Sequence, residues 1–339
     1  MRILVIGGNG FIGSPLVREL LAAGHDAGVF HRGPAPRSNE QAVHIQGDRN
    51  RLRDHEAELR QFAPQVIIDM VLSSGEQAEQ LVDVACDLNA RVVAISSMDV
   101  YRAWGVMQGT EPGDLEPMPV TEESPVRTAR RTYPPEVIEK MKGIFTWLNE
   151  GYDKIAVEEA VMSVGTGGTV IRLPMVYGPG DPLHRMHGML KRIKDGRPAI
   201  ILAEEYAAWR GPRGYVDNVV HAIALASLSE RASGRTYNVC EEPTLNELEW
   251  QTQIAGQTDW QGKFVLLPQE QTPKHLLQPG NPSQQLVASS ERIRRELGYE
   301  EPVAMDEAIR RTIAWELANP PTGPSLHQFD YTAEDAALA

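Results

Sequence analysis

A short segment near the N-terminus, residues 7–13, has the residue types and spacing of a phosphate-binding loop. This segment, Gly-Gly-Asn-Gly-Phe-Ile-Gly, follows an aliphatic run and opens a helical pattern. Gly7 permits a tight turn, Gly10 lets the backbone approach a pyrophosphate, and Gly13 allows close packing of helix on strand. The free N–H groups and the helix dipole then face the phosphates. We therefore predict a dinucleotide site with contacts from Gly7, Gly10, Phe11, Ile12 and Gly13.

The residues after the second aliphatic run indicate which dinucleotide binds. This run ends at His31 and Arg32, where an acid would bind a ribose 2′-hydroxyl, and no acid is present. Arg32, with Arg37 nearby, could pair with a 2′-phosphate, although a solvated arginine is the alternative interpretation. The residues therefore favour NADP(H) slightly over NAD(H). Asp48, next to Arg49, is placed to meet the adenine amino group.

Alternating strands and helices must position these residues. Continuous aliphatic runs between amphipathic helical patterns are typical of a parallel sheet covered on both faces. Right-handed crossovers then favour an α/β fold of the Rossmann type, with a doubly wound parallel sheet. Early strands are expected at 2–6, 27–31, 66–70, 91–96 and 169–173, and early helices at 11–23, 51–62, 76–88 and 152–163.

The later part of the chain combines further sheet strands with a smaller substrate-binding lobe. Residues 103–150 are rich in proline, and so long a connection is expected to be functional or partly structured. Later strands are expected at 199–202, 214–216 and 237–239, and helices at 218–228, 245–255, 289–297 and 304–318. We predict a Rossmann domain of residues 1–173 plus 214–240, a lobe of 174–213 plus 241–319, and a C-terminal tail of 320–339 that lies on the surface or on a partner subunit.

The composition of the chain argues against some classes of binding partner. The 339 residues include 33 Lys and Arg against 46 Asp and Glu, a net charge of −13. Such a surface repels nucleic acid and anionic membranes, so neither is expected as a partner. No apolar stretch is long enough to span a bilayer. Cys86 and Cys240 are predicted to be buried thiols of a reducing compartment, and the N-terminus runs directly into a strand, so we expect a cytoplasmic protein.

Taken in order, the motifs resemble the extended short-chain dehydrogenase/reductase superfamily, in the branch of nucleotide-sugar epimerases and dehydratases. The resemblance covers most of the chain, and only the whole series is specific for the fold. Its marks are residues 7–13, Gly47-Asp48, the Ser-Ser-Met-Asp-Val-Tyr segment at 96–101, Lys154 with Glu158, the segment 172–180, Gly-Tyr-Val-Asp at 214–217, and Tyr-Asn-Val at 237–239.

The resemblance implies the roles of several residues. In such enzymes a Ser polarises the substrate oxygen, a Tyr is the general base, and a Lys four residues later binds the ribose and lowers the Tyr pKa. By position, Ser97 is the serine and Lys154 the lysine; an ion pair of Lys154 with Glu158 on a helix surface is the alternative. The resemblance also implies cofactor contacts from Ser96, Pro174 and Val176. Dimers through two long helices are common in this superfamily, which implies a homodimer through 76–88 and 152–163.

The sequence departs from this pattern at the catalytic tyrosine. Four residues before Lys154 stands Glu150, and Tyr152 precedes Lys154 by two. Helical positions two apart lie about 200° apart around the axis and share no face. Three hypotheses follow. Glu150 is the acid/base; or the helix begins irregularly and Tyr152, or Tyr133 of the long connection, reaches the site; or the chemistry has been lost.

Further candidates are placed by type and by position in the series. Asp99 could orient a substrate hydroxyl or cap a turn, and His184 could line the cleft with His187 three residues later. These two histidines lack a convincing third ligand, so no metal is predicted. Arg210 and Arg213 could bind a substrate diphosphate, with surface arginines as the alternative. The expected substrate contacts are Asp99, Tyr177, His184, Arg210 and Arg213.

Two functions from different classes follow. The first is an NAD(P)-dependent oxidoreductase, epimerase or dehydratase that acts on a hydroxyl or keto carbon of a sugar-like or sugar-nucleotide-like substrate. In it Ser97 holds the oxygen, Tyr152 or Glu150 moves the proton, and Lys154 positions the ribose. The second is a regulatory or RNA-associated protein that binds the cofactor without redox chemistry. The displaced tyrosine favours the second, and the net charge argues against RNA.

Overall fold

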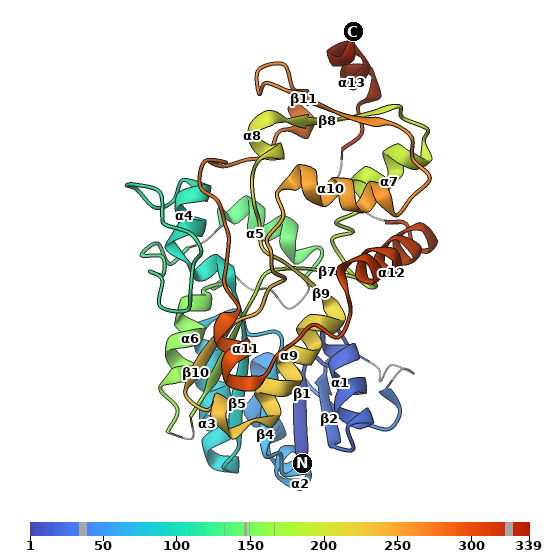
Figure 1. The fold of residues 1–339 in the computed structure, drawn as a ribbon. Helices are drawn as coiled ribbons and strands as arrows, with labels where there is room; N and C mark the ends of the chain where they lie inside the picture. The colour runs from blue at the N-terminus through green and yellow to red at the C-terminus, as the bar shows by residue number, and fades with distance from the viewer. Residues whose placement is uncertain (34–38, 132, 146–147, 149, 166, 323–327) are drawn as a thin grey trace.

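Seven parallel strands form the central sheet of the computed structural model, which describes residues 1–33, 39–131, 133–145, 148, 150–165, 167–322 and 328–339 (Figure 1). The neighbouring strands β1 and β4 lead to opposite edges of the sheet, which defines a doubly wound topology and confirms the expected α/β Rossmann fold. The strand order is β10 (Arg235–Asn238), β6 (Thr169–Leu173), β5 (Arg91–Ser97), β4 (Val66–Asp69), β1 (Arg2–Ile6), β2 (Asp26–His31) and β3 (Val43–Gln46).

Helices cover both faces of this sheet because its strands alternate their side chains between two apolar cores. Along β1, Ile3 and Val5 belong to one buried cluster, and Leu4 and Ile6 belong to the other. Helices α1 (Gly13–Ala22) and α9 (Val216–Leu228) cover the first face, whereas α2 (Glu56–Phe62), α3 (Gly75–Leu88) and α6 (Lys154–Met162) cover the second.

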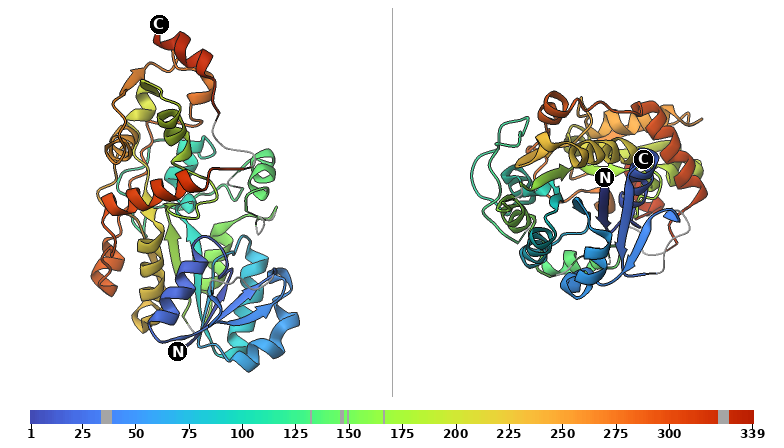
Figure 2. Two further views of the ribbon diagram at one scale, coloured as in Figure 1. Left: turned by 90° about the vertical axis from the view of Figure 1, so that its right-hand side faces the viewer. Right: turned by 90° about the horizontal axis from the view of Figure 1, so that it is seen from below.

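The other elements lie mostly beyond the carboxyl ends of the strands, so that the two chain ends lie at opposite ends of the molecule (Figure 2). Two small parallel sheets pair β7 (Met175–Tyr177) with β9 (Arg213–Tyr215) and β8 (Ala199–Ala203) with β11 (Lys263–Leu267). The division into domains stays a prediction. The helices here are α4 (Arg102–Gln108), α5 (Pro135–Lys142), α7 (His187–Lys194), α8 (Glu204–Ala207), α10 (Glu247–Gly256), α12 (Met305–Ala318) and α13 (Tyr331–Leu338), with α11 (Glu291–Leu297) beside α9.

Several local expectations differ from the structure. The helix expected at 51–62 begins as a 3-10 helix at 49–55, with a non-helical Arg51, before α2. The strand expected at 214–216 pairs with β7 and not with the central sheet. Cys86 is exposed and not buried. No helix in the described part of the chain is long and apolar enough to cross a membrane.

Candidate active site

The glycine loop has a shape that only glycine permits. Gly7 has a φ of +81°, and a Cβ on Gly13 would lie 2.3 Å from the carbonyl oxygen of Gly7. A Cβ on Gly10 would meet only that same oxygen, at 3.4 Å, so this side of the loop is open. No side chain among the described residues caps the start of α1 at Ile12. The loop therefore fits a pyrophosphate, whose oxygens would accept from the N–H groups there.

The residues expected near the adenosine differ in their exposure and in their hydrogen-bond partners. Arg32 is exposed at the end of β2, and Arg37 lies outside the described residues. His31 is buried and hydrogen-bonds the carbonyl oxygen of Gly33 at 2.5 Å, and burial lowers its pKa, so it is neutral at pH 7. Asp48 accepts the N–H of Asn50 at 3.0 Å, which caps the 3-10 helix. The buried guanidinium of Arg49 donates to Asp69 at 2.8 Å, which is a contact within the protein.

A cavity of about 310 Å³ lies where β5 and β6 end, which is where ligands bind in open α/β sheets. We call it the reaction cavity. It brings together residues from the glycine loop, from the end of β5, from the start of α6 and from the segment after β6. Ten of the residues predicted from sequence line it: Phe11, Ile12, Ser96, Ser97, Asp99, Tyr133, Tyr152, Lys154, Pro174 and Val176.

Two phenols converge on one carboxylate in this cavity. The hydroxyl groups of Tyr152 and Tyr133 donate to Oδ2 of Asp99 at 2.7 and 3.1 Å. Oδ1 of Asp99 is buried and has no hydrogen-bond partner among the described residues. Burial raises the pKa of Asp99, and burial together with the Asp99 charge raises the pKa of Tyr152 well above its ordinary value. Tyr152 therefore keeps its proton near neutral pH and is available as an acid.

Lys154 is buried beside this cluster, at 4% exposure, so the surface ion pair with Glu158 is wrong. Its Nζ donates to the backbone carbonyls of Ile95, at 2.9 Å, and Leu72, and lies 6.0 Å from the centre of the Tyr152 ring. Burial lowers the pKa of Lys154 to about 8. A cation is thus fixed at the ends of β4 and β5, facing the phenol.

The start of α6 explains how Tyr152 reaches the site. The helix begins at Lys154, and the side chain of Asp153 caps it by accepting the N–H groups of Ile155 and Ala156 at 3.0 and 3.1 Å. Tyr152 lies before the helix, so helical spacing does not govern its direction. This is the arrangement that the second of the three hypotheses describes.

The two serines at the end of β5 differ in their partners. Oγ of Ser97 accepts the N–H of Asp99 at 3.2 Å, and the Ser97 side chain lines the cavity. Oγ of Ser96 donates to Glu158 at 2.5 Å, and Glu158 also forms a buried ion pair with Arg172 at 2.7 Å. Ser97 is therefore placed to contact a substrate oxygen, whereas the hydroxyl of Ser96 is held within the protein.

The structure places five other predicted residues outside the reaction cavity. Glu150 is exposed and pairs with Lys142 at 3.3 Å, because it lies in the turn before α6 and not on a helix face. Tyr177 is buried and donates to Glu241 at 3.0 Å.

His184, Arg210 and Arg213 are each held by an acid. His184 pairs with Glu316 at 2.8 Å, Arg210 with Glu249 at 3.2 Å, and Arg213 with Glu247. No group of three metal-ligating side chains occurs among the residues that the structure describes.

Other cavity residues had no recognisable sequence pattern. Trp104, Met141 and Phe145 come from the proline-rich region, and Asp181 and Arg185 form an ion pair of 2.7 Å at the rim. No helical or strand spacing in the sequence relates these three apolar residues to the other residues that line the cavity. Their position in a long connection was the only signal, since long connections are often functional.

The fold agrees with comparisons with known proteins. The chain belongs to the NAD dependent epimerase/dehydratase family, whose model matches residues 3–240. It is 29% identical over 251 residues to 2′-dehydrokanamycin reductase of Streptomyces kanamyceticus, which covers 69% of this chain and 60% of that enzyme. It is 23% identical over 255 residues to the chloroplast stem-loop binding protein of 41 kDa b of Arabidopsis thaliana, which covers 71% of this chain and 59% of that protein.

The chain thus spans about 60% of the length of these two relatives. Among solved structures, the UDP-glucose 4-epimerase of Thermotoga maritima in complex with UDP-glucose is similar with a TM-score of 0.67 and 17% identity. That similarity covers 94% of this chain and 99% of the epimerase. At this identity it supports the fold alone. Family membership supports a nicotinamide dinucleotide as the cofactor and a redox, epimerase or dehydratase role.

Proposed function

We propose that the protein is an NAD(P)H-dependent reductase of a carbonyl carbon in a sugar-like substrate, and that it also oxidises the corresponding alcohol. The observation that carries this proposal is the Tyr152 hydroxyl, which donates to Asp99 and lies with Asp99, Ser97 and Lys154 in one cavity. A bound nicotinamide dinucleotide supplies the hydride for the carbonyl carbon. The similarity to a reductase, 2′-dehydrokanamycin reductase, supports the direction.

Each side chain has a part that follows from its position. Ser97 donates a hydrogen bond to the carbonyl oxygen, and Tyr152 gives that oxygen the proton that completes the alcohol. Asp99 holds the phenol in place through Oδ2, and the Lys154 cation stabilises the phenolate that remains. Tyr133 shares Oδ2 of Asp99 and is placed to return a proton to the site through that carboxylate.

The cofactor preference is a second part of the proposal. The absence of an acid at the end of β2 and the presence of Arg32 there favour NADP(H) over NAD(H). The two reduced cofactors should be compared by kcat/KM in the same carbonyl-reduction assay. A higher value with NADH would contradict the preference and leave the proposed chemistry untouched.

The proposed proton donor is tested by a matched pair of variants. With a panel of keto sugars and NADPH, oxidation of the cofactor should be about 10² to 10⁴ times slower in Tyr152→Phe than in the wild type, because the proton donor is lost. Glu150→Gln should match the wild type, because Glu150 is exposed and pairs with Lys142. The reverse ranking would assign the chemistry to Glu150.

A cofactor-binding protein without redox activity is the second candidate. The similarity to the stem-loop binding protein and the displaced tyrosine favour it. Tight NADPH binding, with no turnover of any keto sugar or alcohol in the panel, would support this candidate over the reductase.

A further inference from the structure

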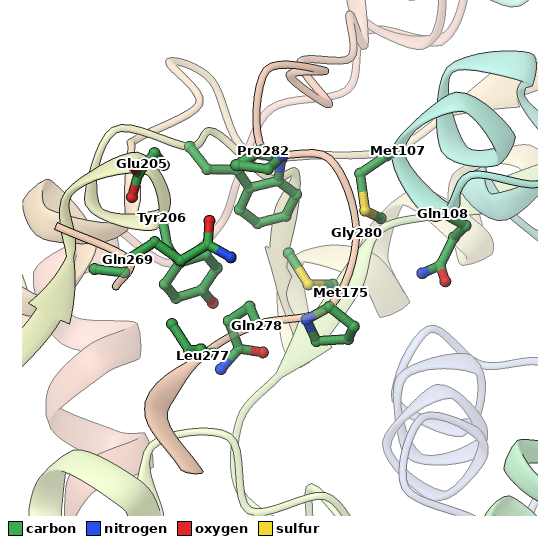
Figure 3. Close-up of a pocket in the computed structure, with 13 residues that line it drawn as sticks. Met107, Gln108, Met175, Glu205, Tyr206, Gln269, Leu277, Gln278, Gly280 and Pro282 are labelled. Carbon is green, nitrogen blue, oxygen red and sulfur yellow. The ribbon is translucent and has the colours of Figure 1, made fainter. Parts of the chain in front are cut away.

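A second cavity, of about 220 Å³, adjoins the reaction cavity, and Met175 lines both (Figure 3). We call it the second cavity. It lies between the end of α4, the segment around α8 and the loop around Gly280. Because Met175 borders both spaces, the second cavity is available to the remainder of a substrate whose reacting carbon lies beside Tyr152.

This lining is neutral or acidic. Among the residues that the structure describes, none that lines the second cavity is Lys, Arg or His, and the one charged residue is Glu205. Carboxamides such as that of Gln278 offer donors and acceptors for hydroxyl or amino groups. The aromatic rings of Tyr206 and Trp209 stack 5.9 Å apart beside them, and such faces attract cations and sugar rings.

The arginines expected to bind a diphosphate are not available to it. Arg213 pairs with Glu247, and Arg210 donates to Glu249, at 3.2 Å, and to the carbonyl oxygen of Thr244. Neither arginine lines either cavity. The two cations among the described residues that line the reaction cavity are also engaged, since Arg185 pairs with Asp181 at 2.7 Å and Lys154 is held by backbone carbonyls. Within the second cavity, a diphosphate would therefore meet Glu205 and no cation among the described lining residues, which is costly.

The charge of the whole chain acts in the same direction. A net charge of −13 repels polyanions and draws cations toward acidic recesses. We propose that the substrate is a polyhydroxylated compound that carries a protonated amine, bound by Glu205 in the second cavity, and not a nucleoside diphosphate sugar. This inference rests on the proposed function, because it describes the substrate of that reduction.

The test measures binding, so it does not depend on turnover. Kanamycin, which carries several protonated amines, and UDP-glucose are titrated by calorimetry into the NADP⁺-saturated protein. Kanamycin should bind and UDP-glucose should not. Glu205→Gln should weaken kanamycin binding about two- to fivefold, the range for an exposed ion pair, and this difference should shrink at high salt.

Glu204→Gln is the matched control, because Glu204 is the neighbouring exposed acid of α8 and does not line the cavity. The proposal is overturned if kanamycin does not bind, if UDP-glucose binds as tightly as kanamycin, or if Glu205→Gln and Glu204→Gln behave alike. If kanamycin binding depends on Glu205 and yet no carbonyl is reduced, the proposed reduction fails while the selectivity of the second cavity stands.

Discussion

At the scale of single residues, Asp99 holds the proposed proton donor at a cost to stability. Its carboxylate is buried, accepts two phenols on one oxygen and leaves the other without a partner among the described residues. A buried oxygen without a partner is destabilising, and such sites are retained where a ligand or a reaction uses them. Asp99 lines the reaction cavity together with Tyr152, so a hydroxyl of a bound substrate is a group that would satisfy Oδ1.

Lys154 gives a prediction with a defined pH window. Its pKa is lowered by burial from 10.5 to about 8 in the folded state. Below pH 8 both the folded and the unfolded chain bind this proton, and the full cost of burying the cation is present. Between about pH 8 and 10.5 the unfolded chain binds more protons, so this residue's contribution to stability rises with pH. Without cofactor, the Tm of the wild type minus that of Lys154→Met should increase across this window.

The half-buried Lys142 provides the control for that measurement. A hydrogen bond to Glu139 raises its pKa, so it does not titrate in this window, and the Tm difference for Lys142→Met should stay flat. A flat or falling difference for Lys154→Met would show that Lys154 keeps its ordinary pKa in the fold.

At the scale of elements, the sequence predicted the features that depend on local patterns of residues. The strands β1, β2, β4, β5 and β6 and the glycine loop follow from aliphatic runs and glycine spacing, whereas β3 is not among the expected strands. The start of α6 does not follow from such patterns, because the Asp153 cap that releases Tyr152 from helical spacing depends on tertiary partners such as Arg130, at 2.8 Å. Tyr133 hydrogen-bonds Asp99, which lies 34 residues earlier in the chain, and no repeating pattern in the sequence indicates this contact.

Substitutions in the glycine loop and at the start of α1 can separate an effect on packing from an effect on cofactor binding. In Gly13→Ala the new Cβ would clash with the Gly7 carbonyl oxygen, 2.3 Å away, so both Tm and NADPH affinity should fall. In Gly10→Ala the new Cβ has only a 3.4 Å contact, so Tm without cofactor should change little. It would stand where the pyrophosphate approaches, so NADPH binding by calorimetry should weaken about tenfold or more. Equal affinity in Gly10→Ala and the wild type would place the phosphates elsewhere.

At the scale of the whole molecule, the C-terminal segment packs back onto the part of the chain beyond the sheet. The described part of the expected tail ends in α13, which lies at the far end of the molecule from the N-terminus (Figure 1). Its Glu334 is buried, accepts from Arg192 at 2.5 Å and hydrogen-bonds His275 at 2.9 Å. A single acid thus joins α13 to α7 and to the segment before Leu277. The homodimer through α3 and α6 stays a prediction.

Loss of the Glu334 charge should therefore destabilise the protein. Glu334→Gln would leave Arg192 buried without its counter-charge, at a cost of about 3 kcal/mol in the free energy of unfolding measured by urea denaturation. Asp335→Asn is the control, because the Asp335 side chain is exposed to solvent and its ion pair with Arg197 should contribute much less to stability. Equal effects of the two substitutions would mean that α13 is not docked through Glu334.

The same ion pair predicts the behaviour of the protein in acid. Burial opposes the charge of Glu334, but hydrogen bonds from Arg192 and His275 outweigh burial and lower its pKa below the usual 4.5. The stabilisation is therefore complete above pH 4.5 and is lost as the pH falls through the lower, folded value. The difference in unfolding free energy between the wild type and Glu334→Gln should shrink below pH 4.5 and stay constant between pH 5 and 6. A difference that stays constant or grows in acid would contradict a lowered pKa of Glu334.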